Sequence, residues 1–464
     1  MNSAVLPRTS PSTAGVDASG LLTFVDALEA APGIDPHSLM LLRGGQVVAE
    51  GWWAPYAPER VHLLYSLSKS FTSTALGLAV AEGLVDLDAT VLSYFPELDA
   101  DITDLRNRGL RVRHIAAMAA GHPVDMLDAA AGLDPRDLVR GFLLTPPEFA
   151  PGSVFAYSQP CTFTVGAIVS RVSGVSLTEF LRLRLFDPLG IATVGWQRDV
   201  SGRELGYSGL HTTTAALASL GQLYLQGGRW DDRQLLPSAW VAEATRSQVS
   251  TAAEQNPDWQ QGYGFQFWRS RHGYRGDGAF GQFCLVLPEL DAVLALTSQT
   301  PDMQSVLDLV WAHVLPALNG VGDPAADAAL VERLVALRIP PAEGGGSLTG
   351  RAPTAAGRTF AAAGGNDQPS LTEVTLSGTD GGWQLELSEG DARLVVPMGV
   401  GEWMVSDALA ASGAWTGDDL HVDVLFVETP HRLQLVCRAS GEFAARWVTA
   451  PLWDSRLADL RMPV

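Results

Sequence analysis

Ser66-Leu67-Ser68-Lys69 places a hydroxyl and an amine three residues apart, at the predicted start of an apolar helix. Residues at this spacing project from one face of a helix, so the two groups can interact. A serine hydroxyl becomes a good nucleophile when a base takes its proton, and a lysine amine is a base only in its neutral form. The pair therefore predicts nucleophilic catalysis, provided that the amine is neutral near pH 7.

The segment SLSKSFTSTALGLAVAEG supplies a setting in which this can happen. Its small and apolar residues lie on all sides of a helix, which predicts a buried helix that ends at Gly83. Burial and the positive end of the helix dipole together can lower a lysine pKa by roughly 3 from about 10.4.

Lys69 is the only lysine in the chain, because the other 30 of its 31 basic residues are arginine. Arginine performs most functions of a surface cation but does not lose its proton at usable pH. A single lysine in such a chain indicates a position where the neutral form matters.

Composition excludes several classes of function. The 464 residues are 47% hydrophobic and carry a formal charge of -20, and no run of Lys or Arg stands out. We therefore expect neither a nucleic-acid groove nor docking on an anionic membrane. The N-terminus has no apolar signal region and no segment reaches roughly 18 uncharged apolar residues, so we expect a cytoplasmic protein. The three cysteines, Cys161, Cys284 and Cys437, have no metal-ligand spacing, and we expect no metal or organic cofactor.

The segment YSLSKSFTSTALGLAVAEGLVDLDATVLSYFPE resembles the nucleophile segment of the serine β-lactamase and penicillin-binding-protein superfamily. It is most similar to the class C-like esterases, amidases and D-aminopeptidases, and the resemblance covers about residues 20–318. It implies that Ser66 is acylated, that Lys69 and a tyrosine transfer protons, and that two backbone amides stabilise the oxyanion. The implied fold class is α+β, an α/β sandwich with an all-helical subdomain.

A second motif of that family is Tyr-x-Asn, and Tyr157-Ser158-Gln159 occupies the matching place. The resemblance makes Tyr157 the residue that passes a proton to the leaving group. The alternative is an aromatic side chain that anchors a loop. Gln159 departs from the family asparagine by one methylene, and we predict that its amide contacts substrate.

The third motif of the family is Lys-Thr-Gly or His-x-Gly on a strand that borders the cleft. The corresponding stretch is GDGAFGQ, residues 276–282. Gly278 is expected to allow close approach of the substrate. By resemblance, the backbone N–H of Ala279 joins that of Ser66 as the oxyanion hole.

This third motif lacks the family cation. No Lys or His stands at its first position, and Arg275 beside it is the candidate for a partial replacement. We therefore do not expect β-lactamase or transpeptidase activity. If the Asp277 carboxylate faces the cleft, it predicts a neutral or amine-bearing substrate. The alternative is that Asp277 is an ordinary turn residue. His62, His122 and His272 are interpreted as packing, loop and solvated residues.

The elements that position these groups follow from periodicity and composition. We predict a hairpin around Gly44-Gly45, helices near both ends of the first domain, and many short strands after a Gly- and Pro-rich shift. The predicted organisation is a flexible tail (1–19), a catalytic domain (20–318) with a helical subdomain (about 100–165), a linker (319–346), and an antiparallel β-barrel-like domain that resembles a lipocalin (347–464).

Together these observations predict a serine hydrolase that cleaves an ester or amide bond through an acyl-enzyme on Ser66. One alternative is acyl transfer, as in penicillin-binding-protein-type thioesterases, which would use a carrier-protein-bound acyl donor. Another is a binding module without catalysis. The expected partner is a small-molecule or peptide-like ester or amide.

Overall fold

The computed structural model describes residues 6–344, 357–379 and 382–463. Its first part is built on a six-stranded antiparallel sheet in the order β2-β1-β11-β10-β9-β8. These strands are β1 (Asp35–Arg43), β2 (Gln46–Trp52), β8 (Trp268–Arg269), β9 (Tyr274–Gly278), β10 (Gln282–Leu287) and β11 (Ala292–Gln299). The predicted hairpin is confirmed, since β1 pairs with β2 across Gly44 and Gly45, both at positive φ.

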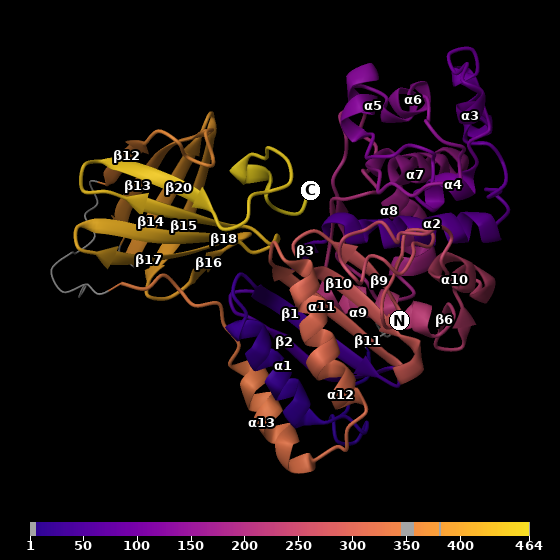
Figure 1. Ribbon diagram of the computed structural model, residues 1–464. Coiled ribbons are helices and arrows are strands. Elements are labelled where there is room, and N and C mark those ends of the chain that lie inside the picture. The colour runs from indigo at the N-terminus through magenta and orange to yellow at the C-terminus, as the bar shows by residue number, and fades with distance from the viewer. Residues whose placement is uncertain (1–5, 345–356, 380–381, 464) are drawn as a thin grey trace.

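Helices cover both faces of this sheet. On one face lie α1 (Ala18–Ala30), α11 (Met303–Leu309), α12 (Leu315–Leu318) and α13 (Pro324–Val335), as Figure 1 shows. On the other face, α9 (Thr214–Leu225) packs against β1, β10 and β11. Apolar residues alternate between the faces of β1, so that Leu39 and Leu41 join one core while Met40 and Leu42 join the other.

The core that contains Met40 and Leu42 extends into a helical region above the sheet (Figure 1). Its helices are α2 (Ser68–Ala81), α3 (Leu105–Arg108), α4 (Val112–Ala116), α5 (Leu127–Leu133), α6 (Leu138–Leu144), α7 (Gln159–Ser173) and α8 (Leu177–Leu181), while α10 (Ser238–Thr245) lies beside the sheet near β6 (Arg229–Trp230). Every residue of α2 from Ser68 to Ala79 is buried, which confirms the predicted buried helix.

The C-terminal part is a closed eight-stranded barrel with one additional short strand at its edge (Figure 1). Its strands are β12 (Arg358–Ala362), β13 (Leu371–Thr379), β14 (Gly382–Glu389), β15 (Ala392–Val400), β16 (Met404–Ser406), β17 (Leu409–Thr416), β18 (Asp419–Phe426), β19 (Arg432–Cys437) and β20 (Glu442–Trp447). Parallel pairings of β12 with β20 and of β15 with β17 close an otherwise antiparallel sheet.

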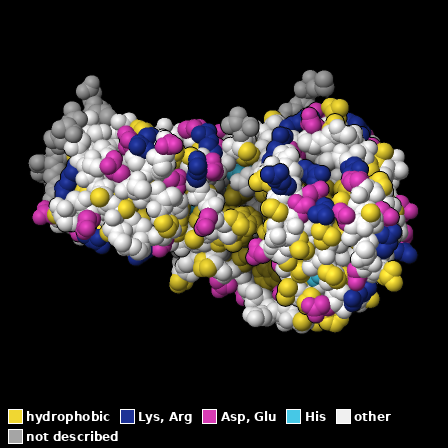
Figure 2. All heavy atoms as spheres, turned by 90° about the horizontal axis from the view of Figure 1, so that it is seen from above, with side chains coloured by type: hydrophobic (Ala, Val, Ile, Leu, Met, Phe, Trp, Pro, Cys, Tyr) yellow, Lys and Arg dark blue, Asp and Glu magenta, His cyan; other side chains and the backbone are white. Residues whose placement is uncertain are grey.

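The barrel touches the first part through hydrogen bonds near the nucleophile segment. The Leu63 N–H donates to Glu428 O at 2.7 Å, and Arg60 Nη1 donates to Asp407 O at 2.7 Å. Seen from above, the surface is hollowed between the two parts, and hydrophobic side chains gather there (Figure 2).

Two segments differ from the predicted organisation. Within the expected flexible tail (1–19), the Pro7 carbonyl accepts from the Val47 N–H, Thr9 donates to Val47 O, and Val16 is fully buried. This stretch is therefore docked on β2. Within the expected linker (319–346), α13 packs against α1 and β2, so these residues complete a layer of the sandwich.

No single helix in the described ranges is long and apolar enough to cross a membrane, although a bent pair, Gln159–Ser173 with Leu177–Phe186, passes by length and composition alone.

Candidate active site

The nucleophile candidate lies at a tight junction between two elements. Ser66 belongs to a 3₁₀ turn, η1 (Tyr65–Leu67), which runs directly into α2. Ser66 is partly exposed, whereas Lys69, one turn later, is only 1% exposed. The Lys69 Nζ atom lies 3.1 Å from Ser66 Oγ. The structure thus brings the hydroxyl and the amine together, with the hydroxyl on the accessible side.

The surroundings of the Lys69 amine determine what it can do. Besides Ser66 Oγ, Nζ contacts Gln159 Oε1 at 2.7 Å and Tyr207 O at 2.9 Å. A neutral amine has two N–H groups and one lone pair. The two oxygens from Gln159 and Tyr207 accept the two N–H groups, and the lone pair is then left for the Ser66 hydroxyl.

Burial favours this neutral form. It lowers the pKa of Lys69 from 10.5 to about 7, although the negative charges of Asp125 and Asp277 raise it in part. Desolvation penalises the ammonium more than these carboxylates stabilise it. A large fraction of the amine is therefore neutral at physiological pH.

Tyr157 lies beside the same pair. The Lys69 Nζ atom is 4.6 Å from the centre of its ring, and the nearby Ser66 side chain lowers the pKa of Tyr157 in part. The ring stacks on Trp268 with centroids 5.5 Å apart. Burial raises the pKa of Tyr157, so its hydroxyl keeps a proton that it can donate.

Gln159 is the first residue of α7, and the structure shows a contact different from the predicted one. Its side-chain oxygen accepts from Lys69, and its backbone N–H donates to Asp125 Oδ1 at 2.9 Å. The amide oxygen therefore orients the base. The predicted contact with substrate stays a prediction for its NH₂ group.

Sequence reasoning did not find Tyr207 or Asp125. Tyr207 acts through its backbone carbonyl, which no side-chain pattern reveals. Asp125 is an exposed loop residue that reaches the site by accepting from the Gln159 N–H.

Strand β9 brings the third motif against the nucleophile turn. A Cβ atom added to Gly278 would overlap the carbonyl oxygen of Leu64 and lie 3.1 Å from Leu67 N. The absent side chain thus allows close packing of β9 on η1, and the predicted close approach of the substrate at Gly278 stays a prediction. Ala279 follows Gly278 directly, and its N–H is predicted to complete the oxyanion hole with that of Ser66.

The missing cation of the third motif has a structural reason. Position 276 is glycine, and a Cβ atom there would lie 2.5 Å from Ser70 Oγ on α2. A side chain at this position would therefore require the Ser70 side chain on α2 to move.

Arg275 is used inside the protein. Its side chain is fully buried, with Nε donating to Asp277 Oδ2 at 2.9 Å and Nη1 donating to Asp258 O at 2.9 Å. Its Nη2 atom has no hydrogen-bond partner among the described residues. Asp277 is 7% exposed and paired with this guanidinium, and burial raises its pKa. The sequence suggested that Arg275 partly replaces the family cation. The structure argues against this, because the Arg275 guanidinium is buried and already paired with Asp277.

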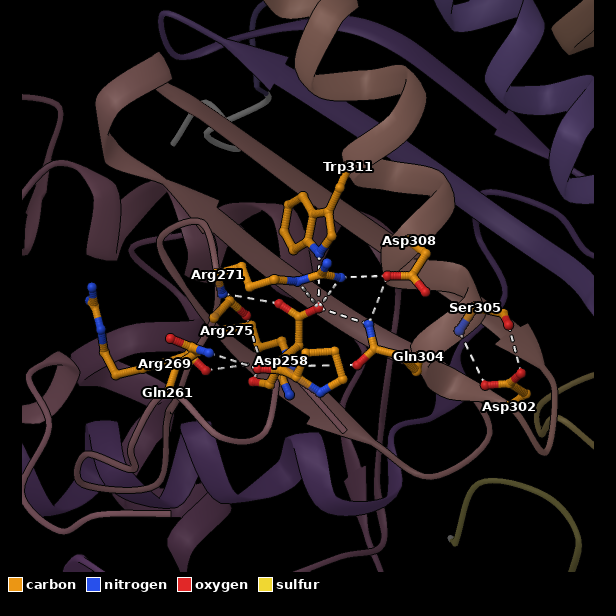
Figure 3. A network of polar contacts seen from close by, with 12 residues as sticks. Asp258, Gln261, Arg269, Arg271, Arg275, Asp302, Gln304, Ser305, Asp308 and Trp311 are labelled. Atoms are coloured by element: carbon orange, nitrogen blue, oxygen red, sulfur yellow. Dashed lines mark hydrogen bonds and ion pairs between the residues drawn. The ribbon is translucent and has the colours of Figure 1, made fainter. Parts of the chain in front are cut away.

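A network of polar contacts that joins β9 to α11 holds this arginine in place (Figure 3). The buried Asp258 carboxylate accepts from Arg271, from Gln304 Nε2 at 2.8 Å and from Trp311 Nε1 at 3.0 Å. Because Asp258 is fixed from several sides, its backbone carbonyl is a rigid acceptor for Arg275.

His62, His122 and His272 contact residues other than Lys69 and Ser66. His62 Nε2 pairs with His37 Nδ1 at 3.0 Å in a buried cluster, and His122 Nε2 donates to Thr145 O at 3.1 Å. His272 lies against Trp311 with ring centroids 5.0 Å apart.

Comparison with known families agrees with this arrangement. The family model described as Beta-lactamase matches residues 23–317, which is more than half of the chain and includes every site residue above. The chain belongs to the beta-lactamase family. The match ends just before α13, so α13 and the barrel lie outside the matched range.

The chain is also similar in sequence to individual relatives and in fold to solved structures. The 6-aminohexanoate-dimer hydrolase of Paenarthrobacter ureafaciens is 28% identical over 57% of this chain and 73% of its own length. A putative 6-aminohexanoate-dimer hydrolase from Bacillus anthracis has a similar fold, with a TM-score of 0.54 over 68% of this chain and 88% of that one, at 22% identity. The octameric penicillin-binding protein homologue from Pyrococcus abyssi covers 93% of this chain and 100% of its own, with a TM-score of 0.52 at 16% identity.

Proposed function

We propose that this protein is a serine hydrolase that cleaves an ester or amide bond through an acyl-enzyme on Ser66. The observation that supports this proposal most is the environment of the buried Lys69 amine. Two oxygen atoms accept from its two N–H groups, and its lone pair is left for the Ser66 hydroxyl. A structural lysine would not need this arrangement, because an exposed or ion-paired cation costs less free energy.

In the acylation step, neutral Lys69 accepts the proton of Ser66 Oγ as that oxygen attacks the carbonyl carbon of the substrate. The new C–O bond forms while the carbonyl π electrons move to oxygen and create the oxyanion. The N–H groups of Ser66 and Ala279 are proposed to stabilise it. The tetrahedral intermediate collapses when the bond to the leaving group breaks.

The leaving group needs a proton when it is an amine or an alkoxide. Tyr157 is proposed to supply it and to recover one from the Lys69 ammonium, which restores the neutral base. The high pKa of the Tyr157 hydroxyl, caused by burial, keeps it protonated for this role. Water then attacks the acyl carbon while Lys69 accepts one of its protons. The bond from that carbon to Ser66 Oγ breaks, Oγ takes the proton back from Lys69, and the free acid leaves.

The charges around the site favour a neutral or amine-bearing substrate. Position 276 is a glycine and carries no cation, and the guanidinium of the neighbouring Arg275 is paired with Asp277. A substrate carboxylate therefore lacks a free cationic partner at this wall, which argues against a β-lactam. The chain's similarity to a hydrolase named for the 6-aminohexanoate dimer supports hydrolysis of a small acyl compound.

Labelling with a fluorophosphonate tests the proposal directly. We expect a covalent adduct on Ser66 by peptide mass spectrometry, and no adduct in Ser66→Ala. We also expect Ser66→Ala and Lys69→Ala to lose activity in a screen of p-nitrophenyl esters and D- or L-aminoacyl amides. Product analysis with an added amine acceptor shows whether the acyl group goes to water or to the amine. A wild-type protein that forms no adduct on Ser66 refutes the enzymatic proposal.

A further inference from the structure

Both residues next to the proposed oxyanion hole have an unusual backbone. Tyr65 precedes Ser66 and has φ of 47°, and Phe280 follows Ala279 and has φ of 68°. Residues with side chains rarely occupy this left-handed region, and they stay there only when the surroundings hold them. The backbone of Tyr65 sets the direction of the Ser66 N–H, because the two share one peptide plane, and Phe280 fixes the chain directly after Ala279.

The barrel supplies a side chain that contacts both residues. His431, which is fully buried in the turn before β19, lies 2.6 Å through its Nε2 atom from the Tyr65 hydroxyl. Its ring centroid is 5.9 Å from that of Tyr65 and 5.4 Å from that of Phe280, both edge-on. The rings of Tyr65 and Phe280 also meet edge-on, with centroids 5.2 Å apart.

The hydrogen bonds determine the form of the histidine. His431 Nδ1 lies 3.0 Å from Thr449 O, and a carbonyl can only accept, so Nδ1 carries the proton. Nε2 is then an acceptor for the Tyr65 hydroxyl. Burial lowers the pKa of His431 to about 4, so this neutral tautomer persists at physiological pH.

We propose that His431 of the barrel is a positioning residue for the oxyanion hole, acting through Tyr65 and Phe280. This inference rests on the proposed hydrolase function. Its consequence is that the barrel completes the active site of the first domain, although it contributes no group that touches the reacting atoms.

The test compares three single variants in steady-state hydrolysis of a p-nitrophenyl ester. Tyr65→Phe removes the donor, His431→Leu removes the acceptor, and His431→Gln keeps an amide that can still accept from Tyr65. The control is Tyr56→Phe, which removes another hydrogen bond between the two parts, from Tyr56 Oη to Thr429 O at 3.2 Å. Thermal unfolding establishes that each variant is folded.

We expect Tyr65→Phe and His431→Leu each to lower kcat about 10-fold and to leave KM nearly unchanged. This loss of kcat is smaller than the roughly 10² to 10³-fold loss caused by removal of an oxyanion donor, because the donor itself stays in place. Affinity for a boronic acid, which forms a tetrahedral adduct on Ser66, should fall by the same factor. The double variant should be no worse than either single one, His431→Gln should recover part of kcat, and Tyr56→Phe should behave as wild type.

Two results overturn this inference and leave the proposed function standing. The first is that kcat and boronate affinity are unchanged in Tyr65→Phe and His431→Leu. The second is that Tyr56→Phe loses activity as they do, with each loss in proportion to the loss of stability. If wild type forms no fluorophosphonate adduct on Ser66, the proposed function and this inference are both refuted.

Discussion

Replacement of Lys69 by arginine separates the charge of this residue from its ability to accept a proton. With a pKa of about 7, about nine-tenths of the Lys69 amine is neutral at pH 8. An arginine with a pKa of about 12.5 is neutral in only about 3 of 10⁵ molecules at that pH. If neutrality of the base limits the reaction, the ratio of these fractions sets an upper bound of about 3 × 10⁴-fold on the loss of kcat/KM.

The assay is hydrolysis of a p-nitrophenyl ester at pH 8, where we expect Lys69→Arg to lose at least about 10³-fold in kcat/KM. The matched control is Arg184→Lys, which exchanges the same two residue types at an exposed ion pair with Glu82. It should leave activity unchanged. A Lys69→Arg variant that is folded and keeps more than about a tenth of the activity would show that residue 69 acts as a cation and not as a base.

Wild type gives a second measure of the same property without any mutation. The protonated form below the pKa is inactive and the neutral form above it is active, so activity rises with pH. For a pKa of about 7, kcat/KM should increase about 10-fold between pH 6 and pH 8. A flat profile over this range would contradict the assignment of Lys69 as the base.

Three further predictions address the surrounding residues. Tyr157→Phe should lower kcat about 10²-fold for alkyl esters and amides but much less for p-nitrophenyl esters, whose leaving group needs no proton; equal losses would contradict proton donation to the leaving group. Gly278→Ala should lower the free energy of unfolding, measured in urea, by about 1 to 3 kcal/mol, because the added Cβ overlaps the nucleophile turn. The control Gly132→Ala should not lower it, because the space around that Cβ is open. Equal stability of the two variants would contradict the tight packing at Gly278. Asp277→Asn should cost about 3 to 5 kcal/mol of stability by leaving the buried Arg275 unpaired, and a change below about 1 kcal/mol would show that this ion pair is not needed.

Much of the fold was predictable because its signals are local. The hairpin around Gly44-Gly45, the buried helix that carries Lys69 and the C-terminal strands each follow from periodicity and turn residues within one segment. The docking of residues 7–16 on β2 was not predictable in this way, since their Ser- and Pro-rich composition is that of a loose tail and the hydrogen bonds come from a distant strand.

The same distinction applies to the site. The contact of Lys69 with Ser66 depends on three positions of one turn and was predictable, whereas its contact with the Tyr207 carbonyl joins residues 138 positions apart through the backbone. The contact of Tyr65 with His431 spans 366 positions and two parts of the chain. Side-chain patterns contain no information on either contact, because neither depends on a periodic spacing.

The pKa of Lys69 can be measured directly, because it is the only lysine in the chain. Protein grown with ¹³C-labelled lysine gives one side-chain Cε resonance, and its chemical shift can be followed from pH 5 to pH 11. We predict a titration midpoint of about 7. A midpoint near the ordinary value of about 10.4 would contradict the claim that burial makes this amine a base for Ser66.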